Sequence, residues 1–384
     1  MGGEQYYKAA KVRGWRTGKV ETSLNEQLDR VEWGEFKIGD LFEIESYKKK
    51  FDSNKVQVLD NGKYPYIVRM GSNNGQKGFI NEDESFLNDG NTISFGQDTA
   101  TMYYQEFPYF TGDKIKIVKA KDKRFSKKNA QFFLSTMKKS FSAFSWGASS
   151  FNVDIIKAQK ITLPILSNNK IDFDFMDGFI AALESERMTN LRAYLSAANL
   201  TDYTLTAKEQ QALDDFEQQK IKFSSFSYSN IFNNIAQGRR LKKDDQIYGE
   251  IPFVMAGVTN TGVVNYISNP VASFPKNSIT IDIFGNTFYR NYEYGAGDDT
   301  GVYWSSDTEY SKEIMLFFTT SMEKSIFGKF DYGNKLRSSQ SFDFTMQLPI
   351  FNKKPDFETM ETFISAILKL VIKDVVLYVN KKLE

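Results

Sequence analysis

Two clusters of basic side chains are the first residues whose type and spacing indicate contact with a partner. They comprise Lys48, Lys49 and Lys50 in the first half of the chain, and Arg239, Arg240, Lys242 and Lys243 in the second. In loops, lysine and arginine make salt-sensitive contacts with phosphate groups that carry no base-sequence information. A single cluster of this kind is more often a solvated surface loop. Because a basic cluster recurs in both halves, a role in binding phosphate and a solvated surface loop are equally good interpretations.

Three pairs of Gly/Asn/Ser-rich loops carry amide, hydroxyl or guanidinium groups that suit base edges, Asn or Gln for adenine and Arg or Lys for guanine. The candidates in the first half are Arg69, Asn73, Asn74, Gln76 and Lys77, then Gln97, Asp98, Thr99 and Thr101, then Trp146, Ser149 and Ser150. Their counterparts are Thr259, Asn260 and Thr261, then Asn286, Thr287 and Arg290, then Tyr332, Asn334, Lys335, Arg337, Ser338 and Ser339. Because turns favour Asn, Gly and Ser for backbone reasons, the alternative for any one residue is a purely structural role.

The chain of 384 residues contains no histidine and no cysteine. His-based triads, thiolate nucleophiles, disulfides and thiolate zinc sites are therefore excluded. Carboxylates acting alone, such as Asp282 and Glu293, leave an enzyme as a distant alternative. We therefore predict a binding protein with no cofactor and no metal site.

Charge and hydropathy limit the kind of partner. The formal net charge is only +1, so any nucleic-acid surface must be local. No apolar run approaches the roughly 18–20 residues of a membrane helix, and no signal-peptide pattern opens the chain. We expect a cytoplasmic protein with no membrane partner.

The candidate residues recur because the sequence contains an internal repeat. The stretch from Phe125 reads FSKKNAQFFLSTMKKS, and 185 positions later the stretch from Tyr310 reads YSKEIMLFFTTSMEKS. Both stretches lead without a gap to Leu-Pro-Ile, at residues 163–165 and 348–350. Further matches in the same order include Gly112-Asp113 with Gly297-Asp298. The order of these blocks predicts two copies of one domain.

Each copy consists of short, aromatic-rich apolar runs separated by Gly, Asn, Asp and Pro, which is typical of a mostly antiparallel β domain. Helical spacing of apolar residues predicts one small helix per copy, at 126–141 and 311–327. The fold class is therefore α+β. Four phenylalanines are expected to be core residues, whereas two tyrosines remain open between stacking on a ligand and burial in a strand: Phe132, Phe133, Phe317 and Phe318, and Tyr103 and Tyr289.

A long amphipathic helix is predicted after each copy. Apolar residues recur every three or four positions from Met176 to Ala198 and from Met360 to Tyr378. A helix of roughly 25 residues extends about 35–40 Å. We expect the two helices to pair antiparallel, hold the two domains apart, and secondarily to dock a partner.

Shorter lead-in helices are predicted before both copies. One covers 206–220, with Thr206 and Glu209 at capping-box spacing. A weaker version runs from Ser23 to Trp33. The predicted organisation is an N-terminal extension with a lead-in helix at 1–30, a first globular domain at 31–166, central spacer helices at 167–222, a second globular domain at 223–351 and a final spacer helix at 352–384.

The order of these motifs resembles the specificity subunit of type I restriction–modification enzymes. The residues that carry the resemblance are FKIGDLFEI at 36–44, answered by FSYSNIFN at 226–233, together with the duplicated Leu-Pro-Ile and the helix that follows it. The resemblance covers about residues 22 to 380. The second domain lacks the Gly-Asp pair of the first motif and the central helical segment is short, so the subclass stays open.

The resemblance implies a non-catalytic subunit in which each domain reads one half of a bipartite double-stranded DNA target. It also implies that the helices dock two methyltransferase subunits, with cleavage carried by a separate motor and nuclease subunit. The sequence lacks the Asn/Asp-Pro-Pro-Tyr/Phe tetrapeptide of a methyltransferase, which agrees with this division of labour. A recognition subunit of a type IIB-like system is the related alternative. A tandem β module that binds carbohydrate or protein is the alternative of a different class.

Overall fold

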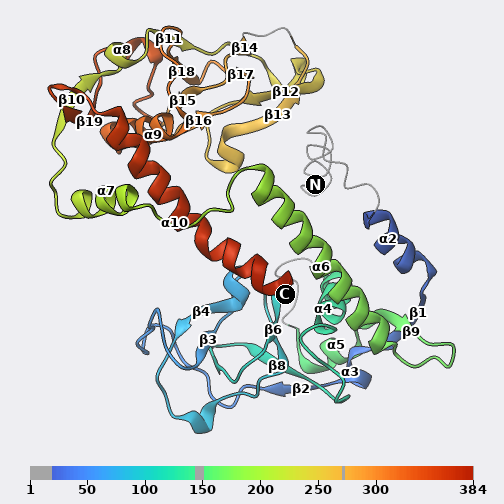
Figure 1. Cartoon of the computed structure of the whole chain (residues 1–384). Helices are drawn as coiled ribbons and strands as arrows, with labels where there is room; N and C mark the ends of the chain where they lie inside the picture. The colour runs from blue at the N-terminus through green and yellow to red at the C-terminus, as the bar shows by residue number, and fades with distance from the viewer. Residues whose placement is uncertain (1–19, 143–150, 270–272, 384) are drawn as a thin grey trace. The chain divides into compact units, whose positions relative to one another are not determined.

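The computed structural model describes residues 20–142, 151–269 and 273–383 (Figure 1). It divides into two compact units, whose boundary between Asn190 and Leu191 falls inside a long helix. Each unit contains one copy of the predicted repeat, and we call these the first copy (32–165) and the second copy (223–351). The α+β fold class and the duplication are both confirmed.

The described residues of the first unit form three sheets, with strand orders β1-β9, β2-β8-β5-β6 and β4-β3-β7. Its strands are β1 Glu32–Lys37, β2 Phe42–Ser46, β3 Pro65–Ile67, β4 Gln76–Phe79, β5 Thr92–Gly96, β6 Met102–Gln105, β7 Phe110–Thr111, β8 Ile115–Ala120 and β9 Lys160–Ile165. Its helices are α2 Val20–Arg30, α3 Ile38–Leu41, η1 Asn73–Gly75, η2 Glu84–Phe86, α4 Ala130–Phe141, α5 Val153–Ala158 and most of α6 Phe173–Ala197.

The second unit repeats this plan, with strand orders β10-β19-β20, β11-β18-β15-β16 and β13-β12-β17-β14. Its strands are β10 Phe223–Ser227, β11 Asn234–Gln237, β12 Tyr248–Val254, β13 Val263–Ile267, β14 Ser273–Phe274, β15 Ser278–Asp282, β16 Thr287–Arg290, β17 Tyr294–Ala296, β18 Thr300–Trp304, β19 Thr345–Phe351 and β20 Lys354–Pro355. Its helices are α7 Ala207–Glu217, α8 Tyr228–Ile231, η3 Lys243–Asp245, η4 Thr259–Gly262, α9 Lys312–Ile326, η5 Ser338–Gln340 and α10 Phe357–Leu383.

Strand pairing confirms the mostly antiparallel prediction, and among the described strands each copy has one parallel pair. β3 pairs with β7 in the first copy, and β12 pairs with β17 in the second. These two parallel contacts occupy the same place in both copies. The two copies therefore share a parallel strand pair within otherwise antiparallel sheets.

The central strands β5 and β15 explain why apolar and hydroxyl residues alternate in their sequences. Successive side chains of a strand point to opposite faces of the sheet. On one face, Ile93 and Ile279 are fully buried in the two main cores. On the other face, the hydroxyl of Thr92 lies 3.1 Å from that of Tyr109, and the hydroxyl of Ser278 lies 2.8 Å from that of Tyr294.

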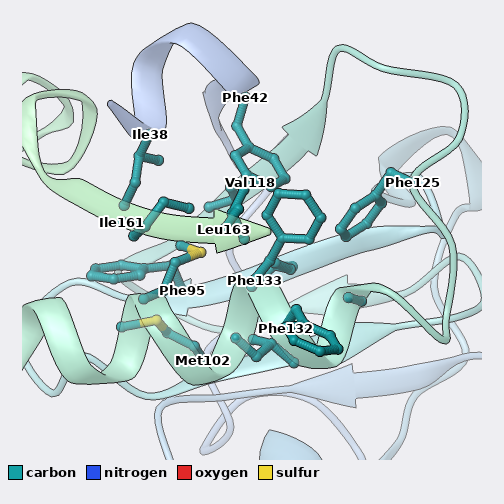
Figure 2. Packing of buried hydrophobic residues seen from close by; sticks show 14 of the residues in the cluster. Ile38, Phe42, Phe95, Met102, Val118, Phe125, Phe132, Phe133, Ile161 and Leu163 are labelled. Atoms are coloured by element: carbon teal, nitrogen blue, oxygen red, sulfur yellow. The ribbon is translucent and has the colours of Figure 1, made fainter. Parts of the chain in front are cut away.

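Aromatic rings fill the core of the first copy, as Figure 2 shows. The ring of Phe133 meets the rings of Phe42 and Phe125 edge to face, with centroids 5.3 and 5.4 Å apart. Such edge-to-face pairs contribute about 0.5–1.5 kcal/mol beyond area burial. Phe132 is buried here too, and Phe318 is buried in the second copy, while Phe317 is partly buried against that core. The predicted core role of these residues is confirmed.

The helices follow their sequence signals closely. α7 carries the predicted capping box, because the Thr206 hydroxyl accepts from the Glu209 N–H while the Glu209 carboxylate accepts from the Thr206 N–H. α4 begins at Ala130, later than predicted, because Asn129 accepts a hydrogen bond from the N–H of Ser126 and forms a turn there. α2 ends at Arg30, so Trp33 lies on β1 instead of in the lead-in helix.

α7 and α10 pack together within the second unit. The rings of Phe216 and Phe363 have centroids 4.7 Å apart. The buried carboxylate of Glu209 accepts from the Ser365 hydroxyl at 2.7 Å and lies 3.0 Å from the Lys369 ammonium. α10 thus follows the second copy and packs against α7, the lead-in helix of that copy. The predicted pairing of α6 with α10 stays a prediction.

Candidate nucleic-acid interface

The two basic clusters follow equivalent strands, β2 and β11. Beyond these strands an equivalent backbone hydrogen bond anchors each loop: the N–H of Phe51 donates to the carbonyl of Thr111 at 2.9 Å, and the N–H of Arg239 donates to that of Ala296 at 2.8 Å. We call these two bonds the anchor bonds. The predicted correspondence of the clusters is therefore approximate, because the lysines precede their anchor bond and the basic residues of the second copy start at theirs. All members are exposed: Lys48, Lys49 and Lys50, and Arg239, Arg240, Lys242 and Lys243.

The first pair of predicted base-reading loops adopts the same rare backbone conformation in both copies. Asn73 and Asn74 have φ of 46° and 53°, and Asn260 and Thr261 have φ of 50° and 51°. Each pair precedes a glycine that is also left-handed. The amide of Asn73 donates to the carbonyl of Gln76 at 2.8 Å, and that of Asn260 donates to Val263 at 3.3 Å. These two asparagines therefore stabilise their own loops, while Lys77 and Thr259 are exposed.

A side chain from a neighbouring strand donates hydrogen bonds to each left-handed loop. This side chain is Gln105 of β6 in the first copy and Arg290 of β16 in the second. In the first copy, Gln105 donates to the carbonyl of Asn74 at 3.2 Å and to the hydroxyl of Ser94 at 3.0 Å. In the second copy, Arg290 donates to the carbonyl and the hydroxyl of Thr261, at 2.6 and 3.2 Å.

Arg290 also donates to Thr280 at 3.0 Å and to Tyr292 at 3.1 Å. Its side chain is only 2% exposed, so it lies in the interior and not at a surface. This corrects the prediction that Arg290 reads a base directly. The sequence carries no sign of this burial, because an arginine at a strand end is usually exposed.

The second pair of loops is also committed to internal contacts. Arg69 and Lys114 both form ion pairs with Asp98, and the amide of Gln97 donates to the carbonyl of Phe151 at 2.8 Å. The hydroxyls of Thr99 and Thr101 lie 2.9 Å apart. Apart from the exposed Lys114, these groups are half-buried, and their mutual contacts pre-organise them in the first copy.

In the second copy, the matching loop folds around the carboxylate of Asp282. It accepts from the N–H of Gly257 at 2.9 Å, and from the N–H and the amide of Asn286 at 3.0 and 2.7 Å. Thr287 is buried, at 5% exposed. Thr287 therefore does not present its side chain to a partner. Asp282, one of the two carboxylates considered for catalysis, thus holds this loop.

The third pair of loops is described only in the second copy, since Trp146, Ser149 and Ser150 lie outside the described residues. The Arg337 guanidinium donates to the carbonyl of Asp298 at 2.6 Å, and Asn334 donates to that of Lys329 at 2.9 Å. Ser338 is buried, and its N–H donates to Gln237 at 2.9 Å. Lys335 lies over the exposed ring of Tyr332, 4.6 Å from its centroid.

Five basic side chains of the second copy line one groove of about 800 Å³. We call it the basic groove, and these residues are Arg240, Lys242, Lys243, Lys335 and Arg337. In the sequence these residues fall into two separate candidate groups, which the fold brings together. Asp298 and Asp299 also line the groove. The carboxylate of Asp299 is used internally, since it accepts from the N–H of Ala256 at 3.0 Å.

A smaller hollow of about 420 Å³ lies on the first copy. Asn74 and Gln76 line it together with Tyr103 and Lys138. The Lys138 ammonium lies 5.5 Å from the centroid of the Tyr103 ring. Tyr103 is thus partly exposed beside a cation, whereas Tyr289, which is also only partly buried, donates its hydroxyl to Asn277 at 3.1 Å.

Asp298 was not among the predicted site residues, although Gly297-Asp298 is one of the markers of the repeat. The sequence carries no signal for this position, because Asp298 meets Arg240 and Lys335 only through tertiary folding. Across the described ranges, no group of three or more carboxylates is arranged to hold a metal ion. None of the described helices has the length and apolar character needed to cross a membrane.

A duplicated α+β frame with unlike loops and a basic groove defines a class of tandem recognition proteins. The chain belongs to the family of the type I restriction modification DNA specificity domain, whose family model matches residues 30–193 and again 220–377. The predicted resemblance is therefore confirmed. The chain is a restriction–modification specificity subunit, whose role is DNA sequence recognition.

Individual relatives agree with this family. The chain is 27% identical over 350 residues to the specificity subunit S.BcgI of a type II restriction enzyme from Heyndrickxia coagulans, covering 89% of this chain and 96% of the relative. Its fold is similar to the crystal structure of a type-I restriction-modification system S subunit from M. genitalium. That match has a TM-score of 0.60 at 17% identity and covers 92% of this chain and 93% of the other.

Proposed function

We propose that each copy reads one half of a bipartite double-stranded DNA target. The observation that carries this proposal is the contrast between frame and loops. Both copies share strand order, parallel contact and left-handed loop, yet the side chains at matching loop positions differ. Two similar frames with unlike loops are suited to two different half-sites.

Contacts with phosphate would come from the basic groove and the lysine cluster, because such contacts fix position on the duplex. Base contacts would come from the exposed groups that the structure leaves available near them. In the second copy these include Lys335 and Thr259, and in the first copy Lys77. The buried Arg290, Thr287 and Ser338 would act by positioning these loops.

An exchange of one domain tests the half-site proposal. Residues 223–351 are replaced by the corresponding domain of a family member with a different target, and the methylated sequences of the host genome are determined. One half of the target should change and the other should stay. The reciprocal exchange of 31–166 is the matched control and should change the other half. A change in both halves, or in neither, would contradict the proposal.

Neutralising the groove tests its phosphate contacts. The double substitution Lys242→Gln and Lys243→Gln should lower the slope of log binding constant against log salt by about 0.9 for each DNA phosphate that the variant no longer neutralises. The matched control is Lys381→Gln with Lys382→Gln near the end of α10, which should leave the slope unchanged. Equal slopes for all three proteins would remove the groove from the interface.

The proposed partners are two methyltransferase subunits, with a motor or nuclease subunit joining them. Support comes from exposed apolar side chains on the C-terminal half of α10, where Val371 is 71% exposed and Tyr378 is 53% exposed. Val371→Asp should abolish co-purification of the methyltransferase with the chain. A substitution on the polar side, Lys373→Asp, is the control and should leave co-purification intact.

The type II relative favours a second candidate, a recognition subunit in a type IIB-like system. In that case the complex purified from the host would contain this chain and one kind of partner with both methylase and nuclease activity. A separate motor subunit in the complex would decide for type I. The family assignment removes the tandem carbohydrate-binding alternative.

A further inference from the structure

Asp298 is an acidic residue placed among the cations of the basic groove. Its backbone is fixed, because its carbonyl accepts hydrogen bonds from Gln237 at 3.1 Å and from Arg337 at 2.6 Å. Its side chain is half-buried. Within residues 20–142, 151–269 and 273–383, no group hydrogen-bonds to its carboxylate and no cation forms an ion pair with it. A negative charge is thus held in position in the groove without an internal partner.

The equivalent residue of the first copy is Asp113. The equivalence rests on matching backbone bonds, from the N–H of Gly112 to Ile67 at 2.9 Å and from that of Gly297 to Val254 at 2.8 Å. The carboxylate of Asp113 is occupied, because it lies 3.5 Å from the Lys50 ammonium and 3.4 Å from the Tyr47 hydroxyl. The two copies therefore place a carboxylate at the same position but neutralise only one.

The difference follows from the residue that precedes the anchor bond. In the first copy this residue is Lys50, which supplies the cation. In the second copy it is Gly238, where a Cβ atom would lie only 2.1 Å from the carbonyl oxygen of Gly297. No side chain fits there, so no residue at this point of the chain can pair with Asp298. The free carboxylate is a consequence of the backbone path.

We propose that Asp298 is a specificity-determining residue that accepts a hydrogen bond from the N4 amino group of a cytosine. This inference rests on the proposed function of the second copy. A carboxylate repels phosphate, so Asp298 faces base edges while the surrounding lysines and arginines hold the backbone.

Cytosine is the base that a free carboxylate suits best. Guanine and thymine present acceptors in the major groove, which a carboxylate repels. Adenine presents its amino group beside the N7 acceptor, which suits an amide and opposes a carboxylate. Cytosine presents an amino donor with no acceptor of its own beside it. The second half-site therefore contains a cytosine read by Asp298.

The test replaces the carboxylate with an amide of the same shape. Three host strains are compared, which carry Asp298→Asn, Asp298→Glu or the unchanged chain. The methylated sites of each genome are determined by sequencing. Asp298→Asn should lose the preference for cytosine at one position of one half-site by about 10- to 100-fold, the cost of one mismatched base pair. Adenine should become acceptable there. Asp298→Glu should keep cytosine.

The matched control is Asp113→Asn, which changes the occupied carboxylate and should leave both half-sites unchanged. An unchanged target in Asp298→Asn overturns the inference. Loss of all modification in both Asp298→Asn and Asp298→Glu also overturns it, because the residue is then structural. Loss in the amide variant alone supports it. If the unchanged chain directs no bipartite pattern, the proposed function fails instead.

Discussion

The left-handed loop of the first copy is held by a neutral side chain, and that of the second copy by a cation. The difference follows from the residue at the loop tip. Asparagine tolerates positive φ, and the amide of Asn74 also donates to the carbonyl of Tyr104 at 3.1 Å, whereas the β-branched Thr261 is a genuine outlier there. Gln105 suffices for the first loop, while Arg290 bonds both the carbonyl and the hydroxyl of Thr261. A repeated backbone can therefore be kept by unlike chemistry.

The largest expected effect comes from replacing Arg290 of the second copy with glutamine, the residue type of Gln105 at the equivalent position of the first copy. Arg290→Gln removes most bonds to Thr261 and leaves a β-branched residue strained, so it should lower the free energy of unfolding by about 3 kcal/mol. Gln105→Ala should lower it by only about 1–2 kcal/mol. Urea denaturation of the purified chain measures both. Equal losses would show that the two loops do not differ in strain.

A double substitution sharpens the same comparison. Thr261→Asn places at the tip the residue type that positive φ tolerates. The loss caused by Arg290→Gln should then shrink by about 1 kcal/mol or more, because neighbouring residues couple. Additive effects of the two substitutions would separate Arg290 from the backbone strain of the loop.

The two lead-in helices form a second contrast, between a buried and an exposed glutamate. Burial raises the pKa of Glu209, but hydrogen bonds from the Thr206 N–H, the Ser365 hydroxyl and the Lys369 ammonium outweigh this and lower the pKa to about 2. Glu26 of α2 forms an exposed ion pair with Arg30 instead. The second unit therefore depends on its glutamate more than the first does.

Glu209→Gln should lower the free energy of unfolding by about 1–3 kcal/mol. Because the folded pKa lies below the ordinary value of 4.5, the stabilisation is complete above about pH 4.5 and is lost as the pH falls towards 2. Urea denaturation at pH 7 and pH 3 measures both effects. Glu26→Gln should cost at most about 0.5 kcal/mol at pH 7. A pH profile of the glutamine variant with the same slope as the native chain would contradict this role.

The sequence predicted the frame better than the site, for physical reasons. Periodicity and the repeat located α7, α10 and the core residue Phe133, because burial imposes a pattern on the sequence. Burial of Arg290 was invisible, since an arginine is buried only when distant partners such as Thr261 satisfy it. The basic groove was also invisible, because it joins Arg240 and Lys335 through tertiary folding.

The smallest expected effect tests what the two copies share. Tyr104 donates to Asn91 at 2.9 Å and Tyr289 donates to Asn277 at 3.1 Å, and both asparagines have positive φ. Burial raises the pKa of both phenols, so both stay protonated donors at neutral pH. Tyr104→Phe and Tyr289→Phe should each cost about 1 kcal/mol in urea denaturation.

The two substitutions should lower the free energy of unfolding by the same amount, because the two tyrosines hold equivalent places in the frame. Each tyrosine links a strand to the start of a small helix, since Asn91 also donates to Phe125 at 3.2 Å and Asn277 to Tyr310 at 2.9 Å. If the frame is common to both copies, the two losses should agree within about 0.5 kcal/mol. A larger gap would place a difference in the frame itself. The unlike loops would then no longer be the only source of difference between the two half-sites.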